Sequence, residues 1–294
     1  MDTQALQKLV ACGGMVPLPR LTFQVDSAIY VPRGTVIDGA GAVVESHHGG
    51  YVFLINGVHD VCIRNLEIRG PWLPNLGDDS AGLGAGIQIQ ESSNITVANV
   101  RIEDMLGRGI VAASNVKGLK IRDCHIDNTS ISVFLFKGVR YSWIEANHIF
   151  NSRIMGIFID DGTEGDTQDT AVSNEYTIVS GNMVLYGGTS PRNMGVGIGV
   201  SGSTDTIISG NIVRFFGNET RISHGIVLNN GQSSFNQGRR TVVSGNILSD
   251  HTGYGFYAMG QQSFVESGNV YANNGSGDMQ IIPKGKRALW GPVM

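Results

Sequence analysis

The chain is poor in charged residues and in cysteine, and it has no long apolar run. Charged residues make up 16% of the sequence, and the net charge of −4 comes without a basic stripe, which argues against a nucleic-acid partner. Cys12, Cys62 and Cys124 match neither a disulfide framework nor a zinc-binding spacing. No apolar run approaches the roughly 20 residues that cross a membrane, so we expect no membrane partner.

Signals for targeting and for a cofactor are also missing. The N-terminus lacks the basic segment and apolar core of a secretion signal, so we expect a cytoplasmic protein unless a signal was removed. The glycines at 195, 197 and 199 fit a repeated β-coil better than a dinucleotide-binding loop. The sequence therefore predicts no cofactor.

Glycine, by contrast, is abundant, with 41 residues, and much of it belongs to two recurring phrases. The phrase Val/Ile-Val/Ile-Ser-Gly-Asn occurs at 178–182, 207–211 and 242–246, and more loosely at 265–269. A second phrase, close to Gly-Ile-x-Ile, precedes each one, at 156–159, 197–200, 225–228 and 255–258. Similarity at a spacing of a few tens of residues indicates stacked units that cannot bury their apolar faces alone.

These units predict a parallel β-helix. They are rich in Val, Ile, Gly and Asn, in short alternating runs without a long helical period. The exception is residues 2–12, where Leu6, Leu9 and Val10 form one face of a short amphipathic helix. Because the terminal unit of a solenoid needs a cover, we expect this helix to cap the open end.

Three stretches carry a resemblance to a known family. The opening helix, Val-Ile-Asp-Gly-Ala-Gly at 36–41 and Val-Cys-Ile-Arg-Asn-Leu-Glu-Ile at 61–68 resemble the pectate-lyase-like superfamily. The resemblance implies an all-β, single-domain, right-handed parallel β-helix over 1–294, with a cap and first strands at 1–50, coils at 51–282 and a tail at 283–294. It implies no single activity, because the superfamily holds lyases, hydrolases, epimerases, phage tailspikes and non-catalytic binders.

Alignment on the Gly-Ile-x-Ile phrase sets the coil boundaries. The basic coil has about 23 residues, as between Gly86 and Gly109, and longer steps are expected to contain loops at 70–85, 162–174, 186–196 and 229–240. The predicted coil starts are Tyr51, Gly86, Gly109, Ser132, Gly156, Gly197, Gly225, Gly255 and Asp278.

The last residue of the Ser-Gly-Asn phrase predicts an internal ladder of amides at a corner. We expect each amide to bond to its neighbours above and below, and Asn also tolerates the left-handed turn that such corners use. The ladder residues are Asn147, Asn182, Asn211, Asn246 and Asn269, with Leu66, Val100 and Cys124 at the same place in earlier coils.

The outward positions of the Gly-Ile-x-Ile strand form an unusually apolar wall, because the second and fourth positions alternate with them and point inward. The third positions are Phe53, Gln88, Val111, Phe134, Phe158, Gly199, Val227 and Tyr257. The fifth positions are Ile55, Gln90, Ala113, Phe136, Asp160, Ser201, Asn229 and Met259. Three interpretations of this wall are open: extra core beneath loops, a subunit interface in a dimer or trimer, or a ligand groove. The flanking loops favour the groove.

Asp160 and Asp161 are the strongest candidates for catalytic residues. Asp160 is expected to project from the wall between Phe136 and Ser201, where aromatic surroundings would raise its pKa and suit an acid or base. Asp161 would lie beside Lys137 of the preceding coil, about 4.8 Å away. Lys137 could neutralise Asp161 or stabilise negative charge in a substrate. The alternative is a surface ion pair worth under about 1 kcal/mol.

Three further polar residues are candidates, two of them at the other edge of the same strands. His224 and Arg108 each precede the Gly of a coil, more than about 10 Å from Asp160. His224, beside Tyr254, is either a base for a bulky substrate or a corner residue bonded to the backbone. Arg153 lies at a turn from which it could reach the groove. The predicted substrate-binding residues are Phe134, Phe136, Phe158, Tyr257, Asn229, Gln88, Arg153 and Arg108.

Three family activities fit poorly, and one of them is that of the mannuronan epimerases, whose Tyr/His/Asp constellation is not evident here. Of the residue set carried by polygalacturonase-like members, only Asp160-Asp161 and, loosely, Ser223-His224-Gly225 are present. The calcium-dependent lyases need a cluster of outward carboxylates that the wall lacks. No metal site is predicted, although a divalent metal on the carboxylates Asp78, Asp79, Asp161 and Asp166 stays open.

These observations favour a cofactor-independent acid–base enzyme of the lyase, epimerase, isomerase or cyclase type. Its predicted substrate is small and partly apolar, since the wall looks drier than a polysaccharide site. The alternatives are a polysaccharide lyase or glycoside hydrolase, including a phage-type depolymerase, and a non-catalytic oligomeric β-helix.

Overall fold

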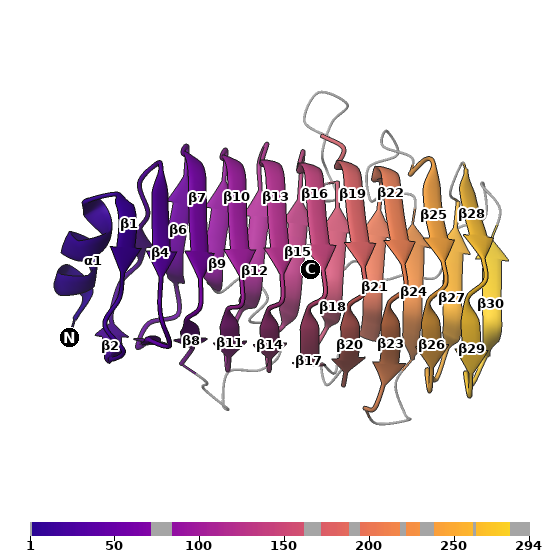
Figure 1. Cartoon of the computed structure of the whole chain (residues 1–294). Helices are drawn as coiled ribbons and strands as arrows, with labels where there is room; N and C mark the ends of the chain where they lie inside the picture. Colours follow the sequence, from indigo (N-terminus) through magenta and orange to yellow (C-terminus); the bar gives the residue numbers. More distant parts are fainter. Residues whose placement is uncertain are drawn as a thin grey trace.

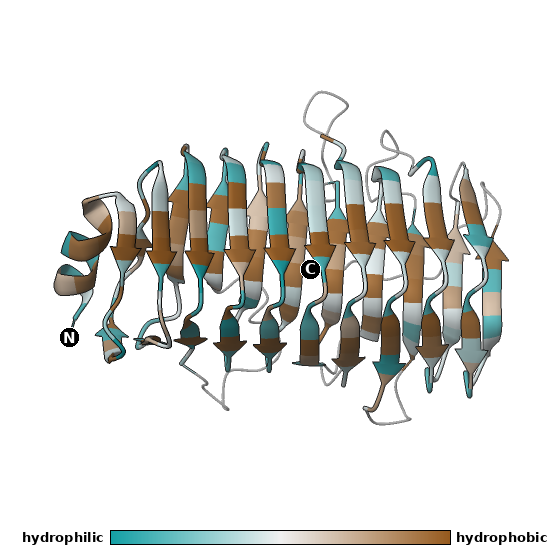
Figure 2. Cartoon of the chain, viewed as in Figure 1, coloured by the Kyte–Doolittle hydropathy of each residue, from teal (hydrophilic) through white to brown (hydrophobic). Residues whose placement is uncertain are grey.

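The computed structural model describes residues 2–71, 84–161, 172–187, 195–217, 222–229, 238–260 and 263–282. The strands form three parallel sheets of ten strands each, and successive coils contribute one strand to every sheet (Figure 1). Apolar residues recur at the same height in successive strands (Figure 2), where their side chains fill one continuous core. The predicted parallel β-helix is confirmed. The predicted tail at 283–294 lies outside the described residues.

Sheet A contains β1 (Gly14–Pro17), β4 (Thr35–Asp38), β7 (His59–Arg64), β10 (Ser93–Ala98), β13 (Lys117–Arg122), β16 (Arg140–Glu145), β19 (Glu175–Ser180), β22 (Thr204–Ser209), β25 (Thr241–Ser244) and β28 (Phe264–Ser267). Sheet B contains β2 (Thr22–Val25), β5 (Val43–Ser46), β8 (Glu67–Arg69), β11 (Arg101–Glu103), β14 (His125–Asp127), β17 (His148–Ser152), β20 (Met183–Tyr186), β23 (Ile212–Phe215), β26 (Ile247–Ser249) and β29 (Val270–Ala272). Sheet C contains β3 (Ile29–Tyr30), β6 (Tyr51–Asn56), β9 (Ala85–Gln90), β12 (Arg108–Ala113), β15 (Ile131–Phe136), β18 (Met155–Asp160), β21 (Gly195–Ser201), β24 (Ser223–Asn229), β27 (Tyr254–Met259) and β30 (Gly277–Ile282).

The helix α1 (Thr3–Ala11) lies at the N-terminal end of the stack, as predicted (Figure 1). It buries Leu6 and Val10 completely and contacts β2 and β3. Leu9, which we expected on the same face, is 42% exposed, so the apolar stripe is narrower than predicted. No helix in the described part of the chain is long and apolar enough to cross a membrane.

The first coil corrects one predicted boundary. Tyr51 pairs with Ala85, and Leu54 pairs with Gln88, so the repeat starts one residue later than we expected. Because strand side chains alternate, this shift turns Phe53 and Ile55 into the core, where both are fully buried. Leu54 takes the outward place that we had assigned to Phe53.

The asparagine ladder lies at the corner between sheets A and B. The Oδ1 atom of Asn211 accepts bonds from the backbone N–H and the side-chain amide of Asn182, both at 2.9 Å. Its own amide donates to the Val179 carbonyl at 3.0 Å and to Oδ1 of Asn246 at 2.9 Å. Asn147 repeats this pattern and accepts from the Cys124 N–H, which places Cys124 in the same stack. Each buried amide is therefore satisfied by the coils on both sides.

The left-handed residue of this corner is not the ladder asparagine. The preceding residue carries the positive φ, as in Ala146 (53°), Gly181 (64°) and Gly210 (64°). Asn is therefore required for its amide, and our expectation that it supplies the left-handed turn is wrong.

The ladder generates a test of stability. Asn211→Asp replaces an amide donor with a carboxylate facing the Val179 carbonyl and Asn246 Oδ1 in a fully buried place. We expect a loss of about 3 kcal/mol or more in the free energy of unfolding, measured with urea at pH 7.5. The control is Asn99→Asp, because Asn99 is exposed and makes one amide bond to Asn65. An equal loss in both variants would show that the ladder has no special role.

Candidate functional site

The outer face of sheet C carries the predicted wall, and it is wider than the sequence indicated. The predicted third and fifth positions form two columns, since Phe134 pairs with Phe158, and Phe136 pairs with Asp160. A further outward column precedes them. It contains Tyr51, Ala85, Arg108, Ile131, Met155, Val196, His224 and Tyr254.

The glycine of the Gly-Ile-x-Ile phrase explains why this column was missed. A Cβ atom on Gly109, Gly156 or Gly197 would meet an inward side chain of sheet B at 2.8 Å or less. Glycine and the following aliphatic residue therefore both face inward, which breaks the simple alternation. The residue before the glycine consequently shares the outer face with the third position.

Most of this wall is buried within a single chain. The exposed fraction is 7% for Phe134 and Tyr257, 3% for Gln88 and 6% for Asp160. A second copy of the chain is therefore not needed to remove these side chains from water. This burial keeps the loop-covered core and the ligand groove as the stronger alternatives.

Asp160 lies at the end of β18, with Phe136 below it and Ser201 above it in the same column. Its backbone carbonyl accepts a bond from the Lys137 N–H at 3.0 Å and from the Asn174 amide at 2.7 Å. The Oδ1 atom of Asn174 also accepts from the Val139 N–H at 2.8 Å. Asn174, which we did not predict, therefore holds the corner where the chain leaves sheet C after Asp160.

Asp161 and Lys137 occupy the corner next to Asp160. The Lys137 Nζ atom lies over the Phe136 ring, 5.3 Å from its centre. Asp161 is fully buried, and its carboxylate lies so close to Gly202 that a Cβ atom there would be 2.1 Å from Oδ2. The next coil therefore packs directly on the Asp161 side chain, so this carboxylate is held in place rather than solvated.

Aromatic rings and one guanidinium group line the wall on the coils of Asp160. The rings of Phe134 and Phe158 stack at 5.4 Å and 4°, and Phe136 lies 5.3 Å from Phe134. The Arg108 guanidinium lies 4.8 Å from the Phe134 ring centre, in a cation–π arrangement. The structure thus brings the Arg108 guanidinium together with the rings of Phe134, Phe136 and Phe158, and their role in substrate binding stays a prediction.

His224 belongs to a separate cluster two strands away. Its ring stacks on Tyr257 at 5.0 Å and on Tyr254 at 5.8 Å, and Nδ1 accepts a bond from the Tyr254 N–H at 2.9 Å. Burial lowers the pKa of His224 to about 4, so the imidazole is neutral at pH 7.

The structure does not bring His224 and Asp160 together. His224 aligns with Val196 and Met155, five residues before Asp160 along the strand. That separation is roughly 16 Å along the sheet, in agreement with the distance that we expected. Asn229 pairs with Ser201 at the Asp160 end, whereas Gln88 lies three strands below Phe158.

Arg153 is buried at a corner of the coil, where it bonds to backbone carbonyls. Its Nη2 atom donates to the carbonyls of Leu106 at 2.5 Å and Met105 at 3.2 Å, and its side chain is 4% exposed. These bonds hold the guanidinium at the corner between sheets B and C. Arg153 therefore has a structural role at this corner, and its role in substrate binding stays a prediction.

Beneath the His224 cluster lies a buried polar pair that we did not predict. The Tyr186 hydroxyl donates to the His224 carbonyl at 2.5 Å and lies 3.0 Å from Nδ1 of His251. Burial, followed by the nearby His224, lowers the pKa of His251 to about 3. Both histidines are thus held neutral in the folded protein.

Possible metal ligands gather on a different face. In the described ranges, the ligand atoms of Glu103, His125 and Asp127 on sheet B come within 4.8 Å of one another. This group is remote from Asp160, and Glu103 is also paired with Arg101. The carboxylates Asp78, Asp79 and Asp166 lie outside the described residues.

Comparison with known proteins identifies the family. Residues 24–175 match the family described as "Right handed beta helix region". The chain belongs to this right-handed β-helix family. The predicted fold and its resemblance to pectate-lyase-like proteins are thereby confirmed. No curated protein matches the chain.

Solved structures show the same fold at low sequence identity. The A-module of the Azotobacter vinelandii mannuronan C-5 epimerase AlgE4 is 15% identical with a TM-score of 0.56, and the match covers 99% of this β-helix chain and 96% of that one. A hyperthermoactive exopolygalacturonase from Thermotoga maritima is 14% identical, with a TM-score of 0.64 and coverage of 97% and 87%. ORF18 of Geobacillus virus E2 is 14% identical, with a TM-score of 0.70 and coverage of 95% and 57%. Identities this low establish the shared fold alone.

The two buried histidines generate a prediction about acid stability. Their folded pKa values, about 4 and about 3, lie below the ordinary value of 6.5, so the unfolded chain takes up protons first as the pH falls. We expect the free energy of unfolding to decrease between pH 6.5 and 4, with about 3 kcal/mol of the loss from His224. Urea unfolding at several pH values measures this loss.

The matched variant is His224→Asn, whose Oδ1 atom can replace Nδ1 as the acceptor for Tyr254. We expect this variant to lose less stability on acidification than the parent chain. If both chains lose the same amount, His224 is not held neutral by the fold.

Proposed function

We propose that the outer face of sheet C is the active site of an acid–base enzyme that acts on a saccharide. The observation that carries the proposal is the position of Asp160. This carboxylate residue is 6% exposed, yet it lies on the outer wall and not in the core of the coil. A carboxyl group in such surroundings suits a general acid or base.

The neighbours of Asp160 have distinct roles in this proposal. Asp160 exchanges a proton with the substrate, and the Lys137 ammonium stabilises negative charge that develops there. Asp161, which is buried against Gly202, holds this corner in place and influences the electrostatic potential at Asp160. Phe134, Phe136 and Phe158 bind the apolar face of the substrate, with Arg108 at the edge of the same cluster.

The distance between clusters limits the mechanism. His224 and Asp160 are too far apart to act on one bond, because hydrogen-bond reach is about 3 Å. In this proposal His224 and Tyr257 therefore contact another part of a long substrate, as do Asn229 and Gln88. A wall of this length suits a chain of several sugar units.

The solved structures support the saccharide class. Two of them are named a mannuronan C-5 epimerase and an exopolygalacturonase, names that specify mannuronan and polygalacturonate as substrates. We therefore place lyase, epimerase and hydrolase chemistry ahead of the isomerase and cyclase types. All of these reactions use proton transfer by a positioned side chain of the enzyme, and glycoside hydrolysis uses carboxyl groups for it.

A second candidate is a small, partly apolar substrate, and the composition of the wall favours it. Val111, Val227 and Phe134 are buried and apolar, and Phe158, which stacks on Phe134, is partly buried, whereas polysaccharide sites carry more polar groups. Activity on a small molecule with no activity on polymers would support this candidate.

The test of the proposal is Asp160→Asn. With polygalacturonate, alginate and neutral glucans as substrates, we expect the variant to reduce kcat by at least about a hundredfold, because it removes the transferable proton. Hydrolysis is measured by the release of reducing ends, and elimination by the absorbance of unsaturated products. Epimerisation is measured by nuclear magnetic resonance of the epimerised residues.

The matched control is Asp123→Asn, an exposed carboxylate paired with Arg122 outside sheet C. It is expected to keep full activity, and circular dichroism checks that both variants are folded. Full activity of folded Asp160→Asn would refute the assignment of Asp160.

A further inference from the structure

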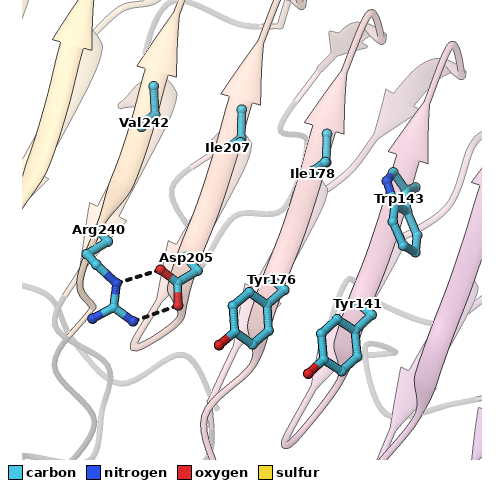
Figure 3. A pocket seen from close by; sticks show the side chains of 8 residues that line it. All are labelled: Tyr141, Trp143, Tyr176, Ile178, Asp205, Ile207, Arg240 and Val242. Atoms are coloured by element: carbon cyan, nitrogen blue, oxygen red, sulfur yellow. Dashed lines mark hydrogen bonds and ion pairs between the residues drawn. The ribbon is translucent and has the colours of Figure 1, made fainter.

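A shallow hollow of about 350 Å³ lies on the outer face of sheet A, around the corner from the Asp160 site. Figure 3 shows the side chains that line it. Tyr141 and Tyr176 form one side, and Trp143 and Ile178 lie beside them on the same strands. Asp205 and Arg240 continue the row on the next two coils. We call these six residues the tyrosine platform.

The two tyrosine rings form a flat, accessible surface. Their planes are parallel, at 0°, and their centres are 5.0 Å apart. This separation follows from the strand spacing of about 4.8 Å, because the tyrosines occupy equivalent places in successive coils. Tyr141 is 49% exposed and Tyr176 is 47% exposed. The stack is therefore available to a ligand.

The backbone conformation at these two tyrosines is energetically unfavourable for a bulky residue. Tyr141 and Tyr176 have φ values of 56° and 55°, in the left-handed region that bulky residues rarely adopt. Earlier coils place Asp60, Asn94 and Gly118 in the same column, all of which suit this conformation. Each tyrosine costs on the order of 1 kcal/mol there. Since earlier coils carry residues that adopt the left-handed conformation at a lower energy, the exposed rings point to a binding role.

Asp205 and Arg240 provide the polar edge of the platform. The Arg240 guanidinium donates two bonds to the Asp205 carboxylate, at 2.5 and 2.6 Å (Figure 3). The pair balances its own charge, so the hollow offers hydrogen-bonding groups without attracting an anion strongly. The carboxylate oxygens still accept bonds, and the guanidinium keeps further N–H donors.

We propose that the tyrosine platform binds a neutral polysaccharide. The apolar C–H face of a sugar ring would lie on the tyrosine rings, and its hydroxyl groups would bond to Asp205 and Arg240. An apolar, aromatic floor with a few polar groups at its edge is typical of ligand sites. The strip is narrow, since Glu145, Ser180 and Ser209 form the next outward column, which disfavours a broad protein interface.

The position of the platform connects it with the candidate active site. The chain passes from Phe136 in β15 directly to Tyr141 in β16, and from Asp160 in β18 to Tyr176 in β19. The platform therefore lies on the same coils as the Asp160 site. The saccharide class rests in part on the proposed function, so the test separates the two.

The experiment is native gel electrophoresis of the Asp160→Asn chain in gels that contain hydroxyethyl cellulose, glucomannan, xylan or polygalacturonate. This background removes turnover, and binding is then read independently of catalysis. We expect at least one neutral polymer to slow migration. Combining Tyr141→Asn with Tyr176→Asn is expected to weaken that binding at least about tenfold, through loss of both ring contacts.

Two controls keep the result specific. Phe216→Asn removes an aromatic ring that is 52% exposed at the end of sheet B, outside both the platform and sheet C, and is expected to leave binding unchanged. The double variant is expected to keep or raise the melting temperature, because Asn tolerates the left-handed conformation. A large fall in melting temperature would show that the rings serve the fold instead.

Three outcomes would overturn the proposal: no retardation by any neutral polymer, retardation by polygalacturonate alone, or equal retardation of the double variant. Sedimentation adds a fourth, in which the parent chain is a dimer and the double variant a monomer. The platform would then be a contact between copies of this chain. Loss of catalysis in Asp160→Asn is measured separately and does not decide any of these results.

Discussion

The vertical register of the coils is the constraint on which the rest of the structure depends. Each residue pairs with its equivalent in the next coil through parallel backbone hydrogen bonds, so the side chains form columns along the solenoid. A slip by one residue would exchange the inner and outer faces of a strand. The asparagine ladder helps to prevent such a slip, because each buried amide needs its partners at one height.

The sequence was sufficient to predict the fold and two of the three outer columns, because both follow from a repeated phrase. It failed where the phrase is absent or misleading. The coil at Tyr51 has no glycine to mark its start, and we placed it one residue early. The column of Arg108 and His224 was missed because glycine and the next residue both face inward, a result of close packing between sheets.

Individual contacts of polar side chains were harder to predict than columns. Nothing local indicates that Arg153 is held by carbonyls of an earlier coil, or that His251 lies next to Tyr186. The platform on sheet A was also invisible, because the left-handed position of Tyr141 and Tyr176 follows from a corner whose earlier occupants share no sequence motif with them. The register therefore assigns two surfaces to the same coils, a buried wall with Asp160 on sheet C and exposed rings on sheet A.

The central claim is that the wall on sheet C receives the substrate. The most direct measurement is a crystal structure of the Asp160→Asn chain soaked with a uronate oligosaccharide and, separately, with a neutral one. The account predicts density for a sugar against Phe134 and Phe158, with one of its oxygen atoms within hydrogen-bonding distance of residue 160. Sugar density confined to sheets A and B, with protein side chains filling the space over residue 160, would contradict it.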